Sequence, residues 1–499
     1  LPTRLPSSIR LMRWLRIDYV SDGLLSWGRL KCCYPKDFFM KTKPFSQAAL
    51  SLAVALALSA CAAPKANPNL TLEATGQVMS AAETAERYDV NGNWWEIYQS
   101  QQLNALMEQA LANNVDLKQA AISVNKALYQ ANILGADLVP SFSGSLGANA
   151  SKNLKTGSHG NTFSSQLGLS YELDLWRKLS ATADAQVWEY QATHEDMANT
   201  RLTLINNVAD AYFNIAYLNE AIELAKKSLK QYQEINRIAN AKFRYGRADS
   251  SQPTQAKQSL LSAENNLLSL QNNLDTQKQV LRNLLNLRPS ENMAADPAQF
   301  RLLPVKGVNL DVPITVLANR PDLRAAEYRL QASQQSVNAQ KRSWYPSITL
   351  GASLSTSSDK AKSTFNIPML GGSATINLPF LNWQTMKWKD KTVQAEMDSA
   401  KLNFEKALTT ALNEVNTNYL AYKNAQSGLA NQEQRYQLDK KNSHYYQVRY
   451  QHGKNELKDW LEALNSEYSS AQNLLNQRYE ALKYENMVYK AMAGRYTPK

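Results

Sequence analysis

Four segments of the chain alternate between apolar and polar residues, which predicts β-strands with one apolar and one polar face. In residues 162–176 most odd-numbered positions are apolar, whereas the even-numbered positions from Ser164 to Asp174 are polar or Gly. The other segments are 141–151, 347–355 and 373–380. Segments of about ten residues with this pattern are typical of membrane barrels, with lipid outside and water inside. A soluble sheet lying against helices is the alternative.

Two very long stretches after these strands predict helical hairpins. Residues 181–244 contain neither Pro nor Gly, and at 1.5 Å per residue a helix there is roughly 95 Å long. Gly246 interrupts it, and a second helix is expected to about residue 287. The same order returns at about 384–450, turns at Gly453 and runs back to about residue 492. Helices far longer than about 25 residues are typical of coiled coils or helical repeats.

The chain contains an internal repeat. Asp116 and Asp322 each precede a predicted helix, and each is followed 24 residues later by a Pro. Gly246 and Gly453 also correspond, and the offset between copies stays at 206 to 207 residues. Each copy therefore contains a helix, two strands and a long helical hairpin. The expected fold class is α+β, with these elements written twice.

This repeat sets the expected domain organisation. The first repeat is expected at 61–287 and the second at 312–495, joined by a Pro-rich linker at 288–311. Each copy supplies two strands, so one chain supplies four. Backbone groups in lipid must be paired, and membrane barrels begin at about eight strands. A chain with four membrane strands must therefore form a cyclic oligomer of at least two copies, and this argument leaves two, three and four open.

The N-terminal region contains a secretory signal. Two lysines precede a 13-residue apolar run at 48–60, which is too short for an ordinary membrane-spanning helix. The run ends in Leu-Ser-Ala-Cys, which resembles a bacterial lipobox. Residues 40–60 are thus the expected lipoprotein signal peptide, and Cys61 is the expected lipidated first residue of the mature chain. A plain signal peptide before a chance Cys is the alternative, and residues 1–39 are expected to be an upstream extension from an early start.

Charge and motifs exclude several classes of function. The net charge is +12, but half of it lies before residue 44. The rest of the chain has no block of Lys and Arg residues of the kind that binds the phosphate backbone of a nucleic acid. We therefore expect no nucleic-acid partner. Cys61 is the only Cys beyond the signal, which leaves no disulfide framework. The four His are scattered and no metal-binding, nucleotide-binding or nucleophile motif occurs, so no catalytic residue, cofactor or metal is expected.

These features resemble the outer-membrane efflux proteins of the TolC/OprM type, particularly their lipoprotein branch. The resemblance covers residues 90–495 and rests on an opening Trp94-Trp95 pattern, on YELDLW at 171–176 and on LANRPDL at 317–323. One departure is clear. The family usually places Gly shortly after the aromatic residue at 176, where this chain has Arg177 and then a lysine.

The resemblance implies a homotrimer with a shared 12-stranded β-barrel in the outer membrane and a twelve-helix periplasmic tunnel. It implies a passive duct for drugs or secreted toxins, with a periplasmic adaptor protein and an inner-membrane pump of the RND or ABC class as partners. The nature of the cargo stays open. An adaptor lipoprotein would have a single hairpin and Gly-rich β domains, and a structural coiled-coil lipoprotein would lack the strands.

Two acids follow the second hairpin turn. Asp459 and Glu462 are three residues apart, which places both carboxylates on one helix face. The resemblance implies that they line a narrow periplasmic gate and that Tyr450 helps to hold it shut. Symmetry would turn each acid into a ring that attracts cations. A solvated helix face is the alternative, and the first-repeat counterpart of Asp459 is Gln252, so one repeat alone can supply the rings.

The two hairpin tips are the remaining candidate sites. Gly246 and Gly453 each mark the turn of one hairpin, and both are expected to adopt a positive φ. These turns are the parts of the chain farthest from the strands. The resemblance implies that helices of the adaptor dock there.

Overall fold

The computed structural model describes residues 65–499 apart from residues 77, 309–311, 314 and 367. The chain divides into two units, Leu1–Cys61 and Ala62–Lys499, and all described residues belong to the second. The expected signal peptide and Cys61 lie outside the described residues, so lipidation stays a prediction. Within the described part, no helix combines the length and the apolar character needed to cross a lipid bilayer.

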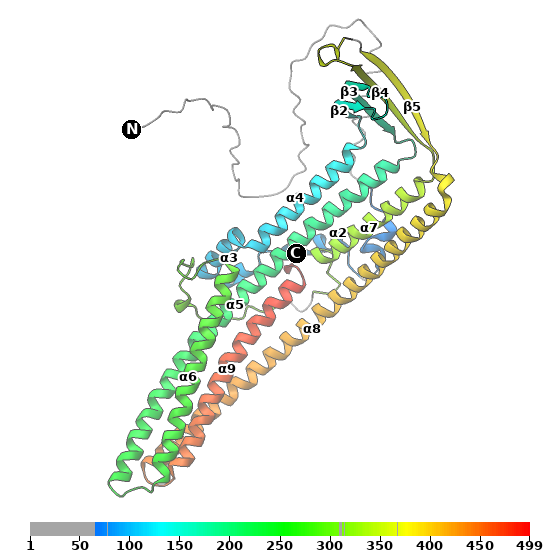
Figure 1. The fold of residues 1–499 in the computed structure, drawn as a ribbon. Helices are drawn as coiled ribbons and strands as arrows, with labels where there is room; N and C mark the ends of the chain where they lie inside the picture. Colours follow the sequence, from blue (N-terminus) through cyan, green and yellow to red (C-terminus); the bar gives the residue numbers. More distant parts are fainter. Residues whose placement is uncertain (1–64, 77, 309–311, 314, 367) are drawn as a thin grey trace, which may run out of the picture. The chain divides into compact units, whose positions relative to one another are not determined.

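The order helix, two strands, helical hairpin occurs twice along the chain (Figure 1). The first copy consists of α4 (Val115–Ala136), β2 (Ser141–Lys152), β3 (His159–Leu173), α5 (Lys178–Arg244) and α6 (Ser251–Leu284). The second consists of α7 (Pro321–Arg342), β4 (Ser347–Ser358), β5 (Met369–Asn377), α8 (Trp383–Gln451) and α9 (Leu457–Ala491). With 67 and 69 residues, α5 and α8 are each about 100 Å long. Neither contains a Pro, which would remove a helix hydrogen bond.

The structure corrects two expected strand boundaries. β3 ends at Leu173, so Trp176 lies in the turn before α5 rather than in the strand. β5 covers Met369–Asn377, and Phe380 lies in the 3-10 helix η7 (Pro379–Asn382). A Pro cannot donate a ladder hydrogen bond and fixes φ, which ends the strand before position 379.

The four strands form one antiparallel sheet in the order β2-β3-β4-β5. Its register aligns the apolar positions of all strands on one face, as predicted from the alternation. Phe142 lies opposite Leu169, and Leu167 lies opposite Leu354, which lies opposite Leu370. A slip of one residue would move every apolar side chain to the other face. In the single chain this face is open, with Phe142 80% and Leu370 83% exposed.

The long helices form two layers that share α5 and α8. Beside the sheet, α4 packs on α5, α5 on α7, and α7 on α8. In the second layer, α6 packs on α5, α5 on α9, and α9 on α8 (Figure 1). Only α5 and α8 therefore run through both layers of the described chain.

The largest hydrophobic cluster surrounds the middle of α5 and includes segments that precede α4 in the chain. The 3-10 helix η4 (Trp94–Tyr98) and α3 (Gln101–Asn113) pack here, and the rings of Tyr98 and Phe213 lie 5.2 Å apart, edge to face. Nearby in sequence, α2 (Ala81–Arg87) leads into β1 (Tyr88–Asn91). β1 pairs antiparallel with β6 (Arg495–Pro498), and this small sheet was not expected from the sequence.

Candidate functional site

The two hairpins end in the same type of turn. Gly246 has φ +67° and Gly453 has φ +69°, which confirms the expected positive φ. In both turns the Gly N–H donates to a carbonyl three residues back, and the next N–H donates to the carbonyl five residues before it. This double hydrogen bond is the Schellman motif, which satisfies helix carbonyls that would otherwise lack partners. A Cβ on either Gly would meet open space, so the requirement for Gly comes from φ alone.

Asp459 caps the helix that follows the second tip. It is the third residue of α9, and its Oδ2 accepts hydrogen bonds from the backbone N–H of Glu456, at 3.2 Å, and from Asn455 Nδ2, at 2.8 Å. The Glu456 side chain in turn accepts from the backbone of Asp459, which completes a capping box. Arg449, in the last turn of α8, donates to Asn455. The half-buried Asp459 is thus tied to both helices of the second hairpin.

Glu462 lies one turn farther along α9 in a different environment. Its side chain is exposed, and its carboxylate lies 3.8 Å from Lys458 Nζ in an i,i+4 ion pair. Such an exposed pair contributes little to stability. Asp459 and Glu462 therefore share a helix, but only Asp459 has a structural role within the single chain. Their expected role at a gate stays a prediction.

Tyr450 lies between the two hairpins. Its side chain is 7% exposed, and its ring packs against Trp460 at 5.4 Å. The Nζ of Lys242, at the end of α5, lies 4.0 Å from the centre of the Tyr450 ring. The Tyr450 hydroxyl is buried and has no hydrogen-bond partner in the part of the chain that the structure describes. The first hairpin thus holds the expected gate tyrosine through a cation–π contact.

Hydrogen bonds between α5 and α9 join the hairpins two to four turns from the tips. The hydroxyl of Tyr232 donates to Asn465 Oδ1 at 2.5 Å, and that of Tyr468 donates to Gln231 Oε1 at 2.7 Å. Burial raises the pKa of Tyr468 to about 12, so this hydroxyl keeps its proton at neutral pH. These contacts were not predicted, because single polar residues on long helices carry no sequence signal for their partner.

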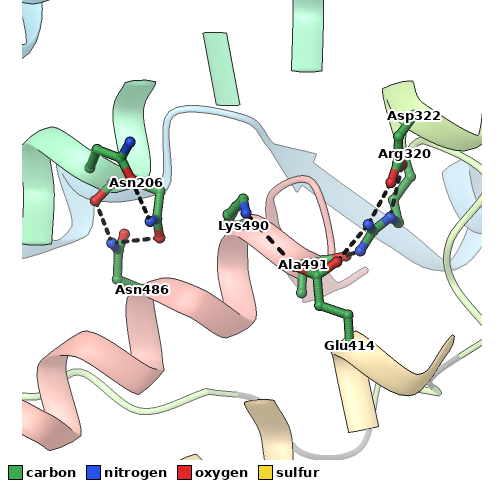
Figure 2. A network of polar contacts seen from close by, with 8 residues as sticks. Asn206, Arg320, Asp322, Glu414, Asn486, Lys490 and Ala491 are labelled. Atoms are coloured by element: carbon green, nitrogen blue, oxygen red, sulfur yellow. Dashed lines mark hydrogen bonds and ion pairs between the residues drawn. The ribbon is translucent and has the colours of Figure 1, made fainter. Parts of the chain in front are cut away.

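A buried arginine joins α7 to the second hairpin (Figure 2). Arg320, expected as part of the second-repeat motif, contacts Asp322 and Glu414 through Nη2, each at 2.7 Å. Its Nη1 donates to the carbonyl of Ala491 at 2.5 Å. Lys490 adds a second contact to Glu414, at 3.7 Å. Removing one partner of such a buried group leaves an uncompensated charge, so this network fixes the start of α7 on α8 and α9.

A buried carboxylate joins α9 to the segment between the repeats. Glu485 is fully buried and accepts hydrogen bonds from Tyr98 Oη, at 2.8 Å, and from the backbone N–H groups of Lys306 and Gly307. Burial raises the pKa of Glu485, and these hydrogen bonds oppose the shift.

Among the described residues, no group of His, Cys, Asp and Glu side chains is arranged to hold a metal ion.

Comparisons with known proteins agree with this architecture. A model of the outer membrane efflux protein family matches residues 106–287 and 312–494. Toxin and drug export protein A of Aggregatibacter actinomycetemcomitans is 43% identical over 451 residues, covering 90% of this chain and 98% of that protein. Cation efflux system protein CusC of Escherichia coli O6:H1 is 27% identical over 465 residues, covering 89% and 98%. The open-state crystal structure of the Neisseria gonorrhoeae MtrE outer membrane channel superposes with a TM-score of 0.71 at 25% identity, covering 79% of this chain and 89% of that one.

The family model alone matches well over half of the chain, and it matches both copies of the repeat separately. The repeated hairpins and the sheet with one apolar face are the physical counterparts of that match. The chain therefore belongs to the outer membrane efflux protein family, and it is an efflux channel of the outer membrane.

Proposed function

We propose that three copies of this chain close into a 12-stranded barrel in the outer membrane, continued by a twelve-helix tunnel in the periplasm. The observation that carries the proposal is the sheet register, which gives a single chain one continuous apolar face. In the described chain, β2 and β5 each pair with only one neighbour. An unpaired edge in lipid is costly, so β5 of one copy would pair with β2 of the next. Three copies of four strands make the barrel that the family resemblance implies.

The helical layers support the same closure. The layer beside the sheet ends in α4 and α8, and the second layer ends in α6 and α8. These end helices have large apolar side chains that are largely exposed in the part of the chain that the structure describes. Examples are Ile122, Tyr129 and Ile133 on α4, Leu261 and Leu268 on α6, and Leu402, Leu420 and Leu438 on α8. Neighbouring copies would bury these side chains and complete each layer as a ring.

We propose that the assembled channel is a passive duct of a tripartite export system. A periplasmic adaptor protein would bind the tips at Gly246 and Gly453, and an inner-membrane pump of the RND or ABC class would supply the energy. No catalytic group is then required. The relative that is 43% identical is named for the export of toxins and drugs, which makes these the cargo classes to test first.

We further propose the domain organisation expected from the sequence. Residues 40–60 would be the signal peptide, Cys61 would bear the lipid, and the repeats would occupy 61–287 and 312–495. The chain would then have a lipid anchor in addition to its barrel. Residues 1–39 would be absent from the mature protein.

We propose that Asp459, Glu462 and Tyr450 form the periplasmic gate that the family resemblance implies. In a trimer, Asp459 and Glu462 would form two acidic rings one helix turn apart, and Tyr450 would lie behind them against Lys242. Ring carboxylates would favour cations at the narrow mouth. The cap on α9 would hold the Asp459 ring in place, whereas the exposed Glu462 would move more freely.

The experiment that tests the proposed function is single-channel recording in planar bilayers, combined with cross-linking of the purified full chain. We expect cross-linked species up to a trimer and discrete conductance steps. As a matched test of strand pairing, cysteines placed in β2 and in β5 should cross-link between copies, whereas cysteines in β2 and β4 should not. A protein that stays monomeric or gives no conductance would contradict the proposal.

A further inference from the structure

The connections between the sheet and the helices expose large apolar and aromatic side chains. All four connections lie at the same end of the sheet, because β2 and β4 begin there and β3 and β5 end there (Figure 1). Each connection contributes at least one exposed side chain to a set that we call the junction belt. It consists of Val139, Trp176, Tyr345, Phe380 and Trp383. Aromatic side chains in this position are typical of the boundary between hydrocarbon and headgroups.

One pair in the junction belt is fixed in place. The rings of Trp176 and Tyr345 stack with centres 4.9 Å apart. The indole N–H of Trp176 donates to the carbonyl of Pro346 at 2.8 Å. This pair joins the end of β3 to the start of β4, and about half of each side chain stays exposed. The belt is therefore a built feature of the fold rather than a set of loose loop residues.

Exposed cations lie next to the junction belt, on its helical side. Arg177 precedes α5, Lys341 lies in the last turn of α7, and Lys387 and Lys389 lie in the first two turns of α8. We call these four residues the basic collar. Asp137, after α4, is exposed at the same end of the helices, and Asp184 in α5 and Asp390 in α8 are half-buried there, so the collar cations outnumber these acids by one. A net positive collar beside an aromatic belt complements the charge of phosphate headgroups.

Arg177 occupies a backbone conformation that disfavours its side chain. Its φ is +58° and its ψ is +32°, in the left-handed region where a residue with a Cβ is strained. Its carbonyl accepts hydrogen bonds from Arg342 Nη1 and from the N–H of Ala181, both at 3.0 Å. Its guanidinium makes no hydrogen bond or ion pair with another described residue, although its charge acts at longer range on the half-buried carboxylate of Asp184. Gly would fit the backbone without strain, so the position keeps an exposed cation at a cost in stability.

We propose that Arg177, with the rest of the basic collar, binds the phosphate of anionic phospholipids on the periplasmic side of the outer membrane. This inference rests on the proposed membrane orientation of the barrel. The apolar sheet face would contact acyl chains, the junction belt would lie at the level of the ester groups, and the collar would reach the phosphates. The guanidinium presents several donors in one plane, which suits two phosphate oxygens at once.

The test is thermal unfolding of the full chain in dodecyl maltoside with added phosphatidylglycerol or phosphatidylcholine of the same acyl chains. We expect phosphatidylglycerol to raise the midpoint of the parent more than phosphatidylcholine does. Without lipid, Arg177→Gly should unfold at the same or a higher temperature than the parent, because the backbone strain is gone. The difference between the unfolding midpoints in the two lipids should fall by more than half in Arg177→Gly. Arg177→Lys should keep most of that difference.

Controls separate the lipid site from other effects. Lys155→Ala, in the turn at the opposite end of the sheet, should leave the lipid difference unchanged. A second variant, Lys341→Ala with Lys387→Ala, should reduce the difference without touching the strained position. Equal effects of both lipids on the parent, a full difference in Arg177→Gly, or an equal gain with inorganic phosphate alone would overturn the proposal.

Recordings of the parent in phosphatidylcholine bilayers and in phosphatidylglycerol bilayers distinguish this proposal from the proposed function. Channels that form without any preference for phosphatidylglycerol would overturn only the lipid inference. Absence of channels in both lipids would contradict the proposed function itself.

Discussion

The ammonium group of Lys242 lies 4.0 Å from the centre of the Tyr450 ring, so each hairpin supplies one half of a single contact near the tips. Lys242 is one of the last residues of α5, and Tyr450 is the penultimate residue of α8. The contact therefore holds α5 and α8 together immediately before the turn that ends each helix. Any outward movement of one tip relative to the other must break it.

Loss of this contact should favour the open channel. A cation–π contact at a partly exposed site contributes about 0.5–1 kcal/mol, so Lys242→Gln should raise the ratio of open to closed channels by about two- to fivefold. Single-channel open probability is the measurement. Lys230→Gln, an exposed change three turns earlier on α5, is the control and should have no effect. An open probability equal to the parent's would show that the contact does not restrain the tips.

The acidic pair should control sensitivity to multivalent cations. Because Asp459 caps α9, Asp459→Ala would also remove a cap worth about 1 kcal/mol, whereas Asp459→Asn keeps an accepting oxygen and removes the charge. We expect Asp459→Asn with Glu462→Gln to abolish most of the block by trivalent cations added at the tip side, with conductance retained. A double variant blocked as readily as the parent would place the gate elsewhere.

The turn at Gly453 should be needed for export more than for assembly. Val is strained at φ +69° because of its branched Cβ, whereas Asn tolerates this region. Gly453→Val should reduce export several-fold while the yield of trimer falls much less, and Gly453→Asn should stay close to the parent. Drug accumulation in cells and trimer yield on native gels are the two measurements. Equal loss of both in Gly453→Val would assign the turn to folding instead of docking.

Glu485 should make stability depend on pH. Its pKa in the folded chain is raised by burial, so the folded state holds the proton more tightly than the unfolded state. The free energy of unfolding should therefore fall as pH rises from the usual glutamate range to the raised pKa, and stay level above it. Glu485→Gln should not show this fall in the free energy of unfolding. Glu485→Ala leaves the buried donors without an acceptor, and should lower the free energy of unfolding by about 2–4 kcal/mol at all pH values. Denaturant unfolding at several pH values measures this, and identical profiles for parent and Gln variant would contradict it.

Lipidation at Cys61 is tested directly. Cys61→Ser should abolish labelling by radioactive palmitate in growing cells, while part of the trimer persists because the barrel itself would hold the protein in the membrane. Labelled protein is detected after immunoprecipitation. Labelling that persists in the Ser variant would contradict the lipobox interpretation.

The parts of the fold that could be predicted are those in which apolar residues, or the absence of helix-breaking residues, follow a regular pattern along the sequence. Two-residue alternation predicted the face of every strand, and the absence of Pro predicted the length of α5 and α8. Strand ends were less predictable because alternation continues past the last paired residue, so Trp176 and Phe380 were placed in strands that end earlier. The length of a strand is set by its partner, which the local pattern does not contain.

The candidate site was predictable in position but not in detail. Gly246 and Gly453 mark turns by their chemistry, and Asp459 and Glu462 follow from their spacing. The cap by Asp459 had no sequence signal, because Glu456 is not among the residues that usually begin a helix. Lys242 was also invisible, since its partner Tyr450 lies more than two hundred residues away.

The continuity of α5 and α8 has a mechanical consequence. α6 and α9 end at Leu284 and Ala491, and α4 and α7 begin only at Val115 and Pro321, so none of these four reaches from the tips to the sheet. A push or a twist applied at the tips can travel to the strands as rigid motion only along the two unbroken rods. The other four helices pack along α5 and α8 and would guide their movement. A Pro introduced midway along α5 or α8 would therefore disconnect the two ends of the chain while leaving each end folded.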